Sequence, residues 1–261
     1  MRSSSQSRRQ FLGGTIVAGA SAALPSIAGA SRQSERSPFV LVHGAWHGGW
    51  CWRRVADRLT AKGRHVVAPT LSGVGERSHL ASDAITLSTH IDDVVNEIKW
   101  KDLDHVVLVG HSYGGMVITG VAERVGERVA SIVYIDAVIP SDGQSFSMLR
   151  GAMATPFPTP MAPPPPAANF KVNEKDVAWV NSKLTSHPTR CFTETLRVSN
   201  AYDRISDKVY IRAPSFPQPG FDAAYQRCRA NREWRTFEMT CGHDVMLDSP
   251  TELAAMLEAL G

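Results

Sequence analysis

Short apolar runs alternate with amphipathic segments along most of this chain. Runs rich in β-branched residues predict buried strands at 38–42, 65–69, 106–109, 131–135, 209–212 and 235–239. Apolar residues at helical spacing predict helices at 52–62, 86–100, 116–125, 221–229 and 250–260. The helix over 86–100 begins near Ser88 and Thr89, either of which can cap it. Strands that alternate with helices through short connections predict a mostly parallel sheet with helices on both faces and the strand over 106–109 near its centre.

The alternation of strands and helices stops between about 141 and 208. Residues 148–166 are rich in Met, Ala and Pro and include the run Pro163 to Pro166, which disfavours regular structure. Residues 174–184 have helical character, and this region offers five apolar side chains for burial: Val177, Trp179, Val180, Phe192 and Leu196. An insertion of this kind between sheet strands predicts a lid that covers a site and excludes water.

The first thirty residues differ in kind from the rest. Arg8 and Arg9 belong to a twin-arginine pattern, which precedes a weakly apolar stretch over 13–24 and a small-residue cleavage site that ends at Ala30. The apolar stretch is short and interrupted by glycine, which disfavours a stable membrane anchor. Residues 1–30 therefore predict a signal read by the twin-arginine export machinery. Residues 31–261 are predicted to form one domain in the bacterial periplasm or outside the cell.

Removal of the signal changes the charge balance. The whole chain has 28 basic and 25 acidic residues. Residues 1–30 hold three arginines and no acidic residue, so the mature chain is close to neutral. Such a chain lacks the basic surplus expected for binding to nucleic acid or to an anionic membrane. A length of 261 residues with 43% hydrophobic residues is instead typical of one globular domain with a sizeable core.

The four cysteines lie far apart, at Cys51, Cys191, Cys228 and Cys241. None has the Cys-x-x-Cys or Cys/His spacing of a metal site, so we expect no bound metal. An oxidising compartment permits disulfides, but the spacing assigns no pairing. Buried free thiols are the simpler expectation.

A glycine-rich turn follows the strand over 106–109. It reads GHSYGG from Gly110 to Gly115 and leads directly into the predicted helix over 116–125. Gly-x-Ser-x-Gly between a strand and a helix is the nucleophile elbow, a strained turn that presents the serine hydroxyl above a sheet. Ser112 is therefore the predicted nucleophile, and the backbone amide of Tyr113 is a predicted donor to the oxyanion.

A second glycine-rich loop, HGAWHGGWCW, follows the first strand. The glycine that precedes Ala45 tolerates unusual backbone angles, so the Ala45 amide is predicted to be the other oxyanion donor. His43 and His47 are predicted to shape the loop through hydrogen bonds, because a stronger candidate for the base lies downstream. Trp46 and Trp50 are predicted to line an apolar substrate pocket.

His243 is the predicted general base. It lies in the loop after the last strand and follows Ser112 in chain order, as the base does after a nucleophile elbow. The alternative for a histidine in this Gly-His sequence is a structural role with satisfied hydrogen bonds.

A carboxylate must orient the base, and three aspartates come into question, with an acid elsewhere or no acid as the remaining alternative. Asp136 stands at the carboxyl end of the strand over 131–135, the edge on which parallel sheets place their sites, and we favour it. Asp222 begins the next helix and is the second candidate, although helix capping explains it adequately. Asp244 adjoins His243, but adjacent residues in a turn seldom orient one another's side chains.

The segments HGAWHGGWCW, GHSYGG and GHD closely resemble the α/β-hydrolase group that contains plant methylesterases, hydroxynitrile lyases and their bacterial relatives. The similarity covers most of the chain from Pro38 to Leu260. It implies the α/β-hydrolase fold and a cofactor-free Ser-His-Asp hydrolase that acts on small, fairly apolar esters. Two departures matter. The loop after the strand over 209–212, where this group usually carries its acid, has no carboxylate, and the Pro-rich lid is unlike that of the plant members.

The expected function is therefore a serine esterase that works through an acyl-enzyme intermediate. A hydroxynitrile lyase resembling this group has a threonine beside the oxyanion loop and a lysine after the base, where this chain has Gly44 and Asp244. A non-catalytic small-molecule binding protein is the other alternative, and the intact Ser112 and His243 argue against it. Perhydrolysis would use the same three side chains, and the sequence does not separate it from ester hydrolysis.

Overall fold

The computed structural model describes residues 36–150, 159–199 and 201–260. The predicted export signal over 1–30 lies outside these residues. Within the described residues, no helix is both long enough and apolar enough to span a bilayer.

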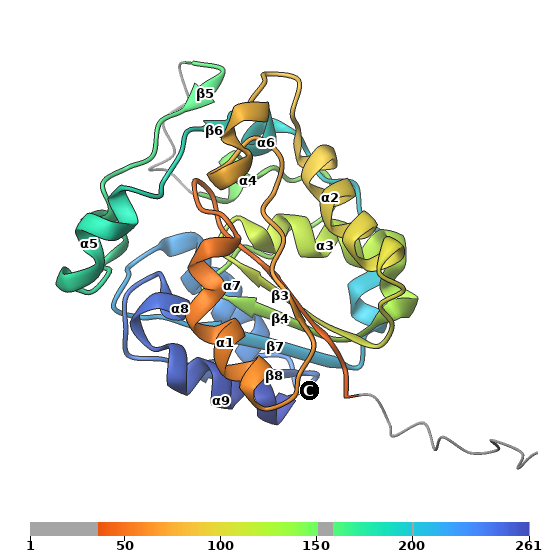
Figure 1. The fold of residues 1–261 in the computed structure, drawn as a ribbon. Helices are drawn as coiled ribbons and strands as arrows, with labels where there is room; N and C mark the ends of the chain where they lie inside the picture. The colour runs from red at the N-terminus through yellow and green to blue at the C-terminus, as the bar shows by residue number, and fades with distance from the viewer. Residues whose placement is uncertain (1–35, 151–158, 200, 261) are drawn as a thin grey trace, which may run out of the picture. The chain divides into compact units, whose positions relative to one another are not determined.

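Six strands form a parallel central sheet in the order β2-β1-β3-β4-β7-β8 (Figure 1). Their bounds are Phe39–Val42 (β1), Val66–Val67 (β2), Val106–His111 (β3), Val129–Ile135 (β4), Asp207–Arg212 (β7) and Trp234–Glu238 (β8). The sequence predicts all six, and β3 lies in the interior of the sheet as expected. The α/β fold with a parallel sheet is confirmed.

Helices cover both faces of the sheet because the interior strands β1, β3 and β4 are apolar on both sides. In β3, Val106 and Leu108 join the apolar layer beneath α2, α3 and α7, whereas Val107 and Val109 join the layer beneath α1, α8 and α9. The helices span Arg53–Ala61 (α1), Leu87–Trp100 (α2), Gly114–Val125 (α3), Pro219–Arg229 (α7), Val245–Asp248 (α8) and Pro250–Leu260 (α9). The sheet therefore divides the core into two apolar layers, one on each of its faces.

Two of the expected helix caps are wrong. The cap of α2 is Thr86, which forms a capping box with Thr89, and the Ser88 hydroxyl instead donates a 2.6 Å hydrogen bond to the Glu194 carboxylate. The cap of α7 is Gln218, followed by a proline in the first turn, so capping does not explain Asp222. In both cases the cap lies N-terminal to the residue that the pattern suggested.

The insertion between β4 and β7 is built from short elements. They are α4 (Phe146–Leu149), β5 (Met161–Ala162), α5 (Glu174–Asn181), β6 (His187–Pro188) and α6 (Arg190–Thr193), with 3-10 turns at Ala167–Phe170 and Ala201–Arg204. The strands β5 and β6 pair antiparallel, so part of the Pro-rich stretch is regular, contrary to expectation. Val180, Phe192 and Leu196 are buried, as their apolar character predicts. The helix predicted over 174–184 corresponds to α5.

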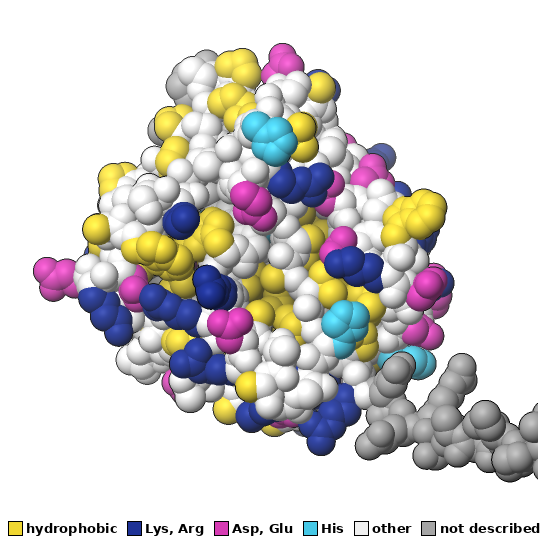
Figure 2. All heavy atoms as spheres, viewed as in Figure 1, with side chains coloured by type: hydrophobic (Ala, Val, Ile, Leu, Met, Phe, Trp, Pro, Cys, Tyr) yellow, Lys and Arg dark blue, Asp and Glu magenta, His cyan; other side chains and the backbone are white. Residues whose placement is uncertain are grey.

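The cysteines are unpaired, and charges of both signs are mixed on the surface (Figure 2). All four cysteines carry free thiols, and only Cys241 is partly exposed. Figure 2 shows basic and acidic side chains interspersed over the face in view, with hydrophobic side chains gathered near its centre.

Candidate active site

Ser112 occupies the turn between β3 and α3. Its φ angle is +56°, in the left-handed region that residues with a side chain seldom adopt. Gly114 allows the turn to pass close to β1, because a Cβ atom there would lie 2.8 Å from the Val42 carbonyl oxygen. The GHSYGG segment therefore folds into a sharp strand-to-helix turn with Ser112 at its tip.

Asp136 and His243 are in direct contact. The Asp136 Oδ2 and His243 Nδ1 atoms lie 2.5 Å apart, and both side chains are buried. Asp136 follows β4 directly, with a φ angle of +42° that turns the chain sharply at the end of the strand. Because a carboxylate accepts hydrogen bonds, Nδ1 carries the proton of this pair and Nε2 is left as the basic nitrogen of His243.

The base loop is fixed to the elbow and to aromatic side chains. His111, which precedes Ser112, donates a 2.9 Å hydrogen bond from Nε2 to the His243 carbonyl oxygen, and the two rings lie 4.4 Å apart. Phe216 and Phe221 stack on the His243 ring with centroids at 4.5 Å and 5.3 Å. These contacts hold the ring in one orientation in surroundings with little water.

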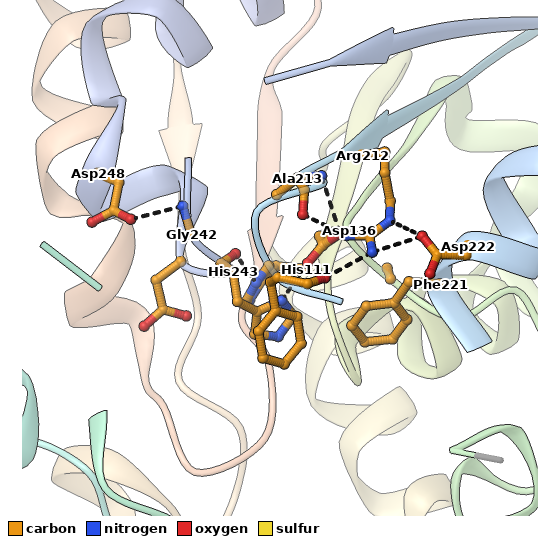
Figure 3. A network of polar contacts seen from close by, with 12 residues as sticks. His111, Asp136, Arg212, Ala213, Phe221, Asp222, Gly242, His243 and Asp248 are labelled. Atoms are coloured by element: carbon orange, nitrogen blue, oxygen red, sulfur yellow. Dashed lines mark hydrogen bonds and ion pairs between the residues drawn. The ribbon is translucent and has the colours of Figure 1, made fainter. Parts of the chain in front are cut away.

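Arg212 joins the Asp136 carboxylate to a second carboxylate. This buried guanidinium donates from Nη1 to Asp136 and from Nε and Nη2 to Asp222 Oδ1, at 3.0 Å and 2.8 Å for the latter two bonds (Figure 3). The backbone amide of Ala213 also donates to Asp136 Oδ1, at 3.1 Å. One oxygen of Asp136 therefore faces His243, while the other is held by Arg212 and Ala213.

The other two candidate acids have different partners. Asp222 binds Arg212, and Asp244 binds His47. Sequence reasoning missed Arg212. The sequence does contain an indication of its role, because Arg212 ends an apolar strand at the edge of the sheet that carries the site. A charged side chain at such a buried position requires a counter-charge. That charge is Asp136, which lies 76 residues earlier in the chain.

The two predicted oxyanion donors lie on adjacent loops. A Cβ atom on Gly44 would lie 2.9 Å from the Ser112 Cβ, so only glycine lets the Ala45 loop approach the elbow this closely. Within the described residues, neither the Ala45 amide nor the Tyr113 amide donates a hydrogen bond. Both amides are therefore free to bind an oxyanion.

The two predicted pocket tryptophans have different neighbours. Trp46 is half-buried and contacts the rings of Phe170 and Phe192, at 6.1 Å and 5.7 Å. Trp50 stacks on His47 at 5.3 Å and meets Trp179 edge-on. A surface hollow of about 230 Å³ lies elsewhere, lined by residues of α2, α3 and 194–197, and contains none of the predicted site residues. That Trp46 and Trp50 line the substrate pocket remains a prediction.

His47 and Asp244 form a buried ion pair beside the site. His47 donates from Nδ1 to the Ala45 carbonyl oxygen at 2.8 Å and from Nε2 to Asp244 Oδ2 at 3.1 Å, so both ring nitrogens carry protons. Burial opposes this charge, but the Asp244 carboxylate outweighs it and raises the pKa of His47 above its usual 6.5. Burial of Asp244 raises its pKa, but the pairing with His47 outweighs this and lowers the pKa to about 2. The pair ties the oxyanion loop to the base loop.

We expect the His47→Gln variant to lose about 3–5 kcal/mol of unfolding free energy, because it leaves the Asp244 carboxylate buried without its counter-charge. Urea unfolding near pH 6 measures the loss. The double variant His47→Gln/Asp244→Asn removes both charges and should recover part of it. A single variant as stable as the wild type would mean that the pair does not carry charge.

The stabilisation from this pair also depends on pH. Asp244 contributes fully above its usual pKa of 3.8, and its contribution is lost as the pH falls through about 2. His47 contributes fully below 6.5, and its contribution is lost as the pH rises through its raised pKa. The unfolding free energy of wild type relative to the double variant should therefore be greatest between about pH 4 and 6.5.

His90, His187 and Cys191 are the described residues that most resemble a metal centre. Their possible ligand atoms lie within 4.8 Å of one another, and all three are buried. His90 already uses both ring nitrogens, which bond to the Tyr113 hydroxyl at 3.0 Å and to the Ser72 carbonyl oxygen at 2.9 Å. Burial also raises the pKa of the Cys191 thiol to about 12. The cluster is therefore a set of neutral, hydrogen-bonded groups.

The sequence of this chain is similar to those of known hydrolases and esterases. The sequence profile of a family described as "Alpha/beta hydrolase family" matches residues 39–256. A carbendazim-hydrolysing esterase from Nocardioides sp. (strain SG-4G) is 39% identical over 239 residues, which cover 85% of this chain and 99% of that protein. Methylesterase 1 of Arabidopsis thaliana is 31% identical over 130 residues, 49% of each chain.

The fold is also similar to a solved structure. An extracellular α/β-hydrolase from a Paenibacillus species, described as sharing structural and functional homology with tobacco salicylic acid binding protein 2, superposes with a TM-score of 0.76. The two sequences are 25% identical, and the match covers 86% of this chain and 99% of the other.

Proposed function

Because this chain belongs to the α/β-hydrolase family and has esterases among its relatives, we propose that it is a serine esterase for small, fairly apolar carboxylic esters. The observation that carries the catalytic assignment is the 2.5 Å contact between Asp136 and His243, whose carbonyl oxygen is bonded to His111, the residue before Ser112 in the strained strand-to-helix turn. A nucleophile, a base and an orienting acid are the three groups that acyl transfer requires.

In the proposed mechanism, Ser112 Oγ attacks the ester carbonyl carbon while His243 Nε2 takes the hydroxyl proton. Asp136 holds the Nδ1 proton and stabilises the imidazolium that forms. The amides of Ala45 and Tyr113 bind the oxyanion of the tetrahedral intermediate. His243 then passes its proton to the leaving alkoxide, which departs as the alcohol and leaves the acyl group on Ser112.

Water completes the cycle in the second half of the mechanism. His243 Nε2 removes a proton from a water molecule, the hydroxide adds to the acyl carbon, and the same two amides hold the second oxyanion. Collapse of this intermediate releases the carboxylic acid and returns the proton to Ser112. Every step uses side chains and amides of this chain.

Hydrolysis of a series of p-nitrophenyl esters, from acetate to octanoate, tests this proposal, and carbendazim belongs in the panel because of the Nocardioides relative. An activated phosphonate ester should abolish the activity and add one phosphonyl group to the peptide that contains Ser112. Turnover that survives complete labelling of Ser112, or no turnover on any substrate, would overturn the proposal.

We also propose that the protein is exported by the twin-arginine pathway and acts in the periplasm or outside the cell. The support is the twin-arginine pattern and the small-residue site that ends at Ala30. Sequencing the N-terminus of the exported protein should find Ser31 first. An unprocessed protein retained in the cytoplasm would contradict the proposed export.

A further inference from the structure

The β5–β6 segment, residues 161–188, binds Trp46 at three points. The Trp46 amide donates to His187 Nδ1 at 3.2 Å, the Trp46 indole Nε1 donates to the Ala162 carbonyl oxygen at 3.1 Å, and the Thr185 amide donates to the Trp46 carbonyl oxygen at 3.1 Å. Trp46 has a φ angle of +65°, a strained value for a residue with a large side chain. The β5–β6 segment therefore holds a strained residue that directly follows Ala45.

The peptide units on both sides of Ala45 are fixed by histidines. The Gly44–Ala45 unit, which contains the Ala45 amide, has its carbonyl oxygen bonded to His43 Nδ1 at 2.8 Å. The Ala45–Trp46 unit has its carbonyl oxygen bonded to His47 and its N–H bonded to His187. His43 and His47 belong to the loop itself, whereas His187 is supplied by the β5–β6 segment and lies 141 residues after Trp46.

The protonation of His187 follows from its partner. A backbone N–H can only donate, so His187 Nδ1 is an unprotonated acceptor and the ring proton is on Nε2. Burial, with the nearby histidines His90, His43 and His47, lowers the pKa of His187 well below its usual value, so the ring stays neutral. Within the described residues, Nε2 has no hydrogen-bond partner. The bond to Trp46 is thus the polar interaction that this buried ring makes.

The same ring also contacts the other oxyanion residue. His187 stacks on Phe192 with centroids at 4.5 Å, and its ring meets the Tyr113 ring edge-on at 5.1 Å. The Tyr113 hydroxyl donates to His90 Nδ1, because His90 Nε2 already donates to a carbonyl oxygen. His187 therefore contacts both Trp46, which follows the proposed donor Ala45, and Tyr113, which carries the other proposed donor.

We propose that His187 is a positioning residue for the oxyanion hole, holding the Trp46 amide so that the preceding Ala45 amide faces the oxygen of the ester carbonyl group attacked by Ser112. The proposal rests on the esterase function proposed above. It makes the β5–β6 segment part of the catalytic geometry, since loss of the His187 bond leaves the Ala45–Trp46 peptide unit held only through its carbonyl oxygen and better able to rotate toward a less strained conformation. An oxyanion donor that turns away stabilises the transition state less, while binding of the ground-state ester changes little, so kcat falls and KM does not rise.

Two variants of the full chain separate the hydrogen bond from the packing. His187→Phe keeps an aromatic ring against Phe192 but removes the acceptor for Trp46. His187→Asn removes the ring but keeps an acceptor near the position of Nδ1. We expect His187→Phe to lower kcat on p-nitrophenyl acetate by about 10- to 100-fold with KM within twofold, because full loss of one donor costs about 10²–10³-fold. His187→Asn should stay within about threefold of wild type.

An aryl trifluoromethyl ketone gives a second readout. Ser112 Oγ adds to its carbonyl carbon, the carbonyl π electrons become the alkoxide, and the hydroxyl proton passes to His243, so its affinity reports on the oxyanion hole. We expect His187→Phe to weaken inhibition by the same factor as kcat. Unchanged kcat in His187→Phe, or an equal loss in both variants, would overturn the positioning role. A wild-type enzyme without turnover would instead overturn the esterase proposal.

Discussion

Asp136→Asn is expected to lower kcat/KM on p-nitrophenyl acetate by about 10⁴-fold. The asparagine amide can present a donor to His243 Nδ1, which would place the ring proton on Nε2 and remove the base that faces Ser112. The variant would also leave Arg212 with one carboxylate in place of two. Steady-state kinetics on purified protein, with circular dichroism to confirm the fold, measure the effect.

Asp222→Asn is the matched control for this experiment. It makes the same chemical change at the second carboxylate on Arg212, at a side chain that is about half exposed and does not bind His243. We expect its kcat/KM to remain within about tenfold of wild type, because the buried Asp136 still balances the guanidinium. If Asp222→Asn loses 10⁴-fold and Asp136→Asn does not, the acid has been assigned to the wrong residue.

Ser112→Ala should lower kcat by about 10⁵- to 10⁶-fold, the loss expected when a serine nucleophile is removed. The change deletes one oxygen atom, so an unfolding midpoint equal to or slightly above that of wild type is expected. The alanine keeps the same strained φ angle, so the strain is unchanged, and the hydroxyl that is lost is proposed to serve catalysis rather than stability.

Ser131→Ala provides the matched control for Ser112→Ala. Ser131 is also buried, and its hydroxyl has no hydrogen-bond partner among the described residues. It should therefore tolerate the same deletion with unchanged kcat. Ester hydrolysis by Ser112→Ala at more than one hundredth of the wild-type rate would mean that another residue is the nucleophile.

The sequence predicts those parts of this fold whose cause is local. Each strand of the sheet carries its own β-branched run, and α3 follows Ser112 because glycines permit the turn between them. The candidate nucleophile and base are found in the same way, since GHSYGG and GHD each mark a loop by residue type. Boundaries differ by one or two residues where caps such as Thr86 and Gln218 lie outside the periodic pattern.

The features that sequence reasoning missed depend on partners far apart in the chain. Arg212 meets Asp136 across 76 residues, and Trp46 meets His187 across 141. His47, predicted only to shape its loop, meets Asp244 across 197 residues and is charged because of it. No periodicity or motif predicts which residues form these long-range pairs. The pairs arise when the fold brings separate loops to the carboxyl edge of one sheet.

The adjacency of β3 and β4 has a consequence for how this scaffold can be altered. The last paired residues of the two strands are His111 and Ile135, so Ser112 and Asp136 each follow directly from one rigid strand pair. The segment 213–220 after β7 thus carries no proposed reacting group, and its fixed points are the Ala213 amide and the Phe216 carbonyl oxygen that bind Asp136 and Arg212. Gln218 caps α7, and Pro219 and Gly220 form its first turn, so these residues must be kept. Pro214, Ser215 and Pro217 are exposed, and they are therefore the positions open to randomisation in directed evolution with the nucleophile and its acid left in place.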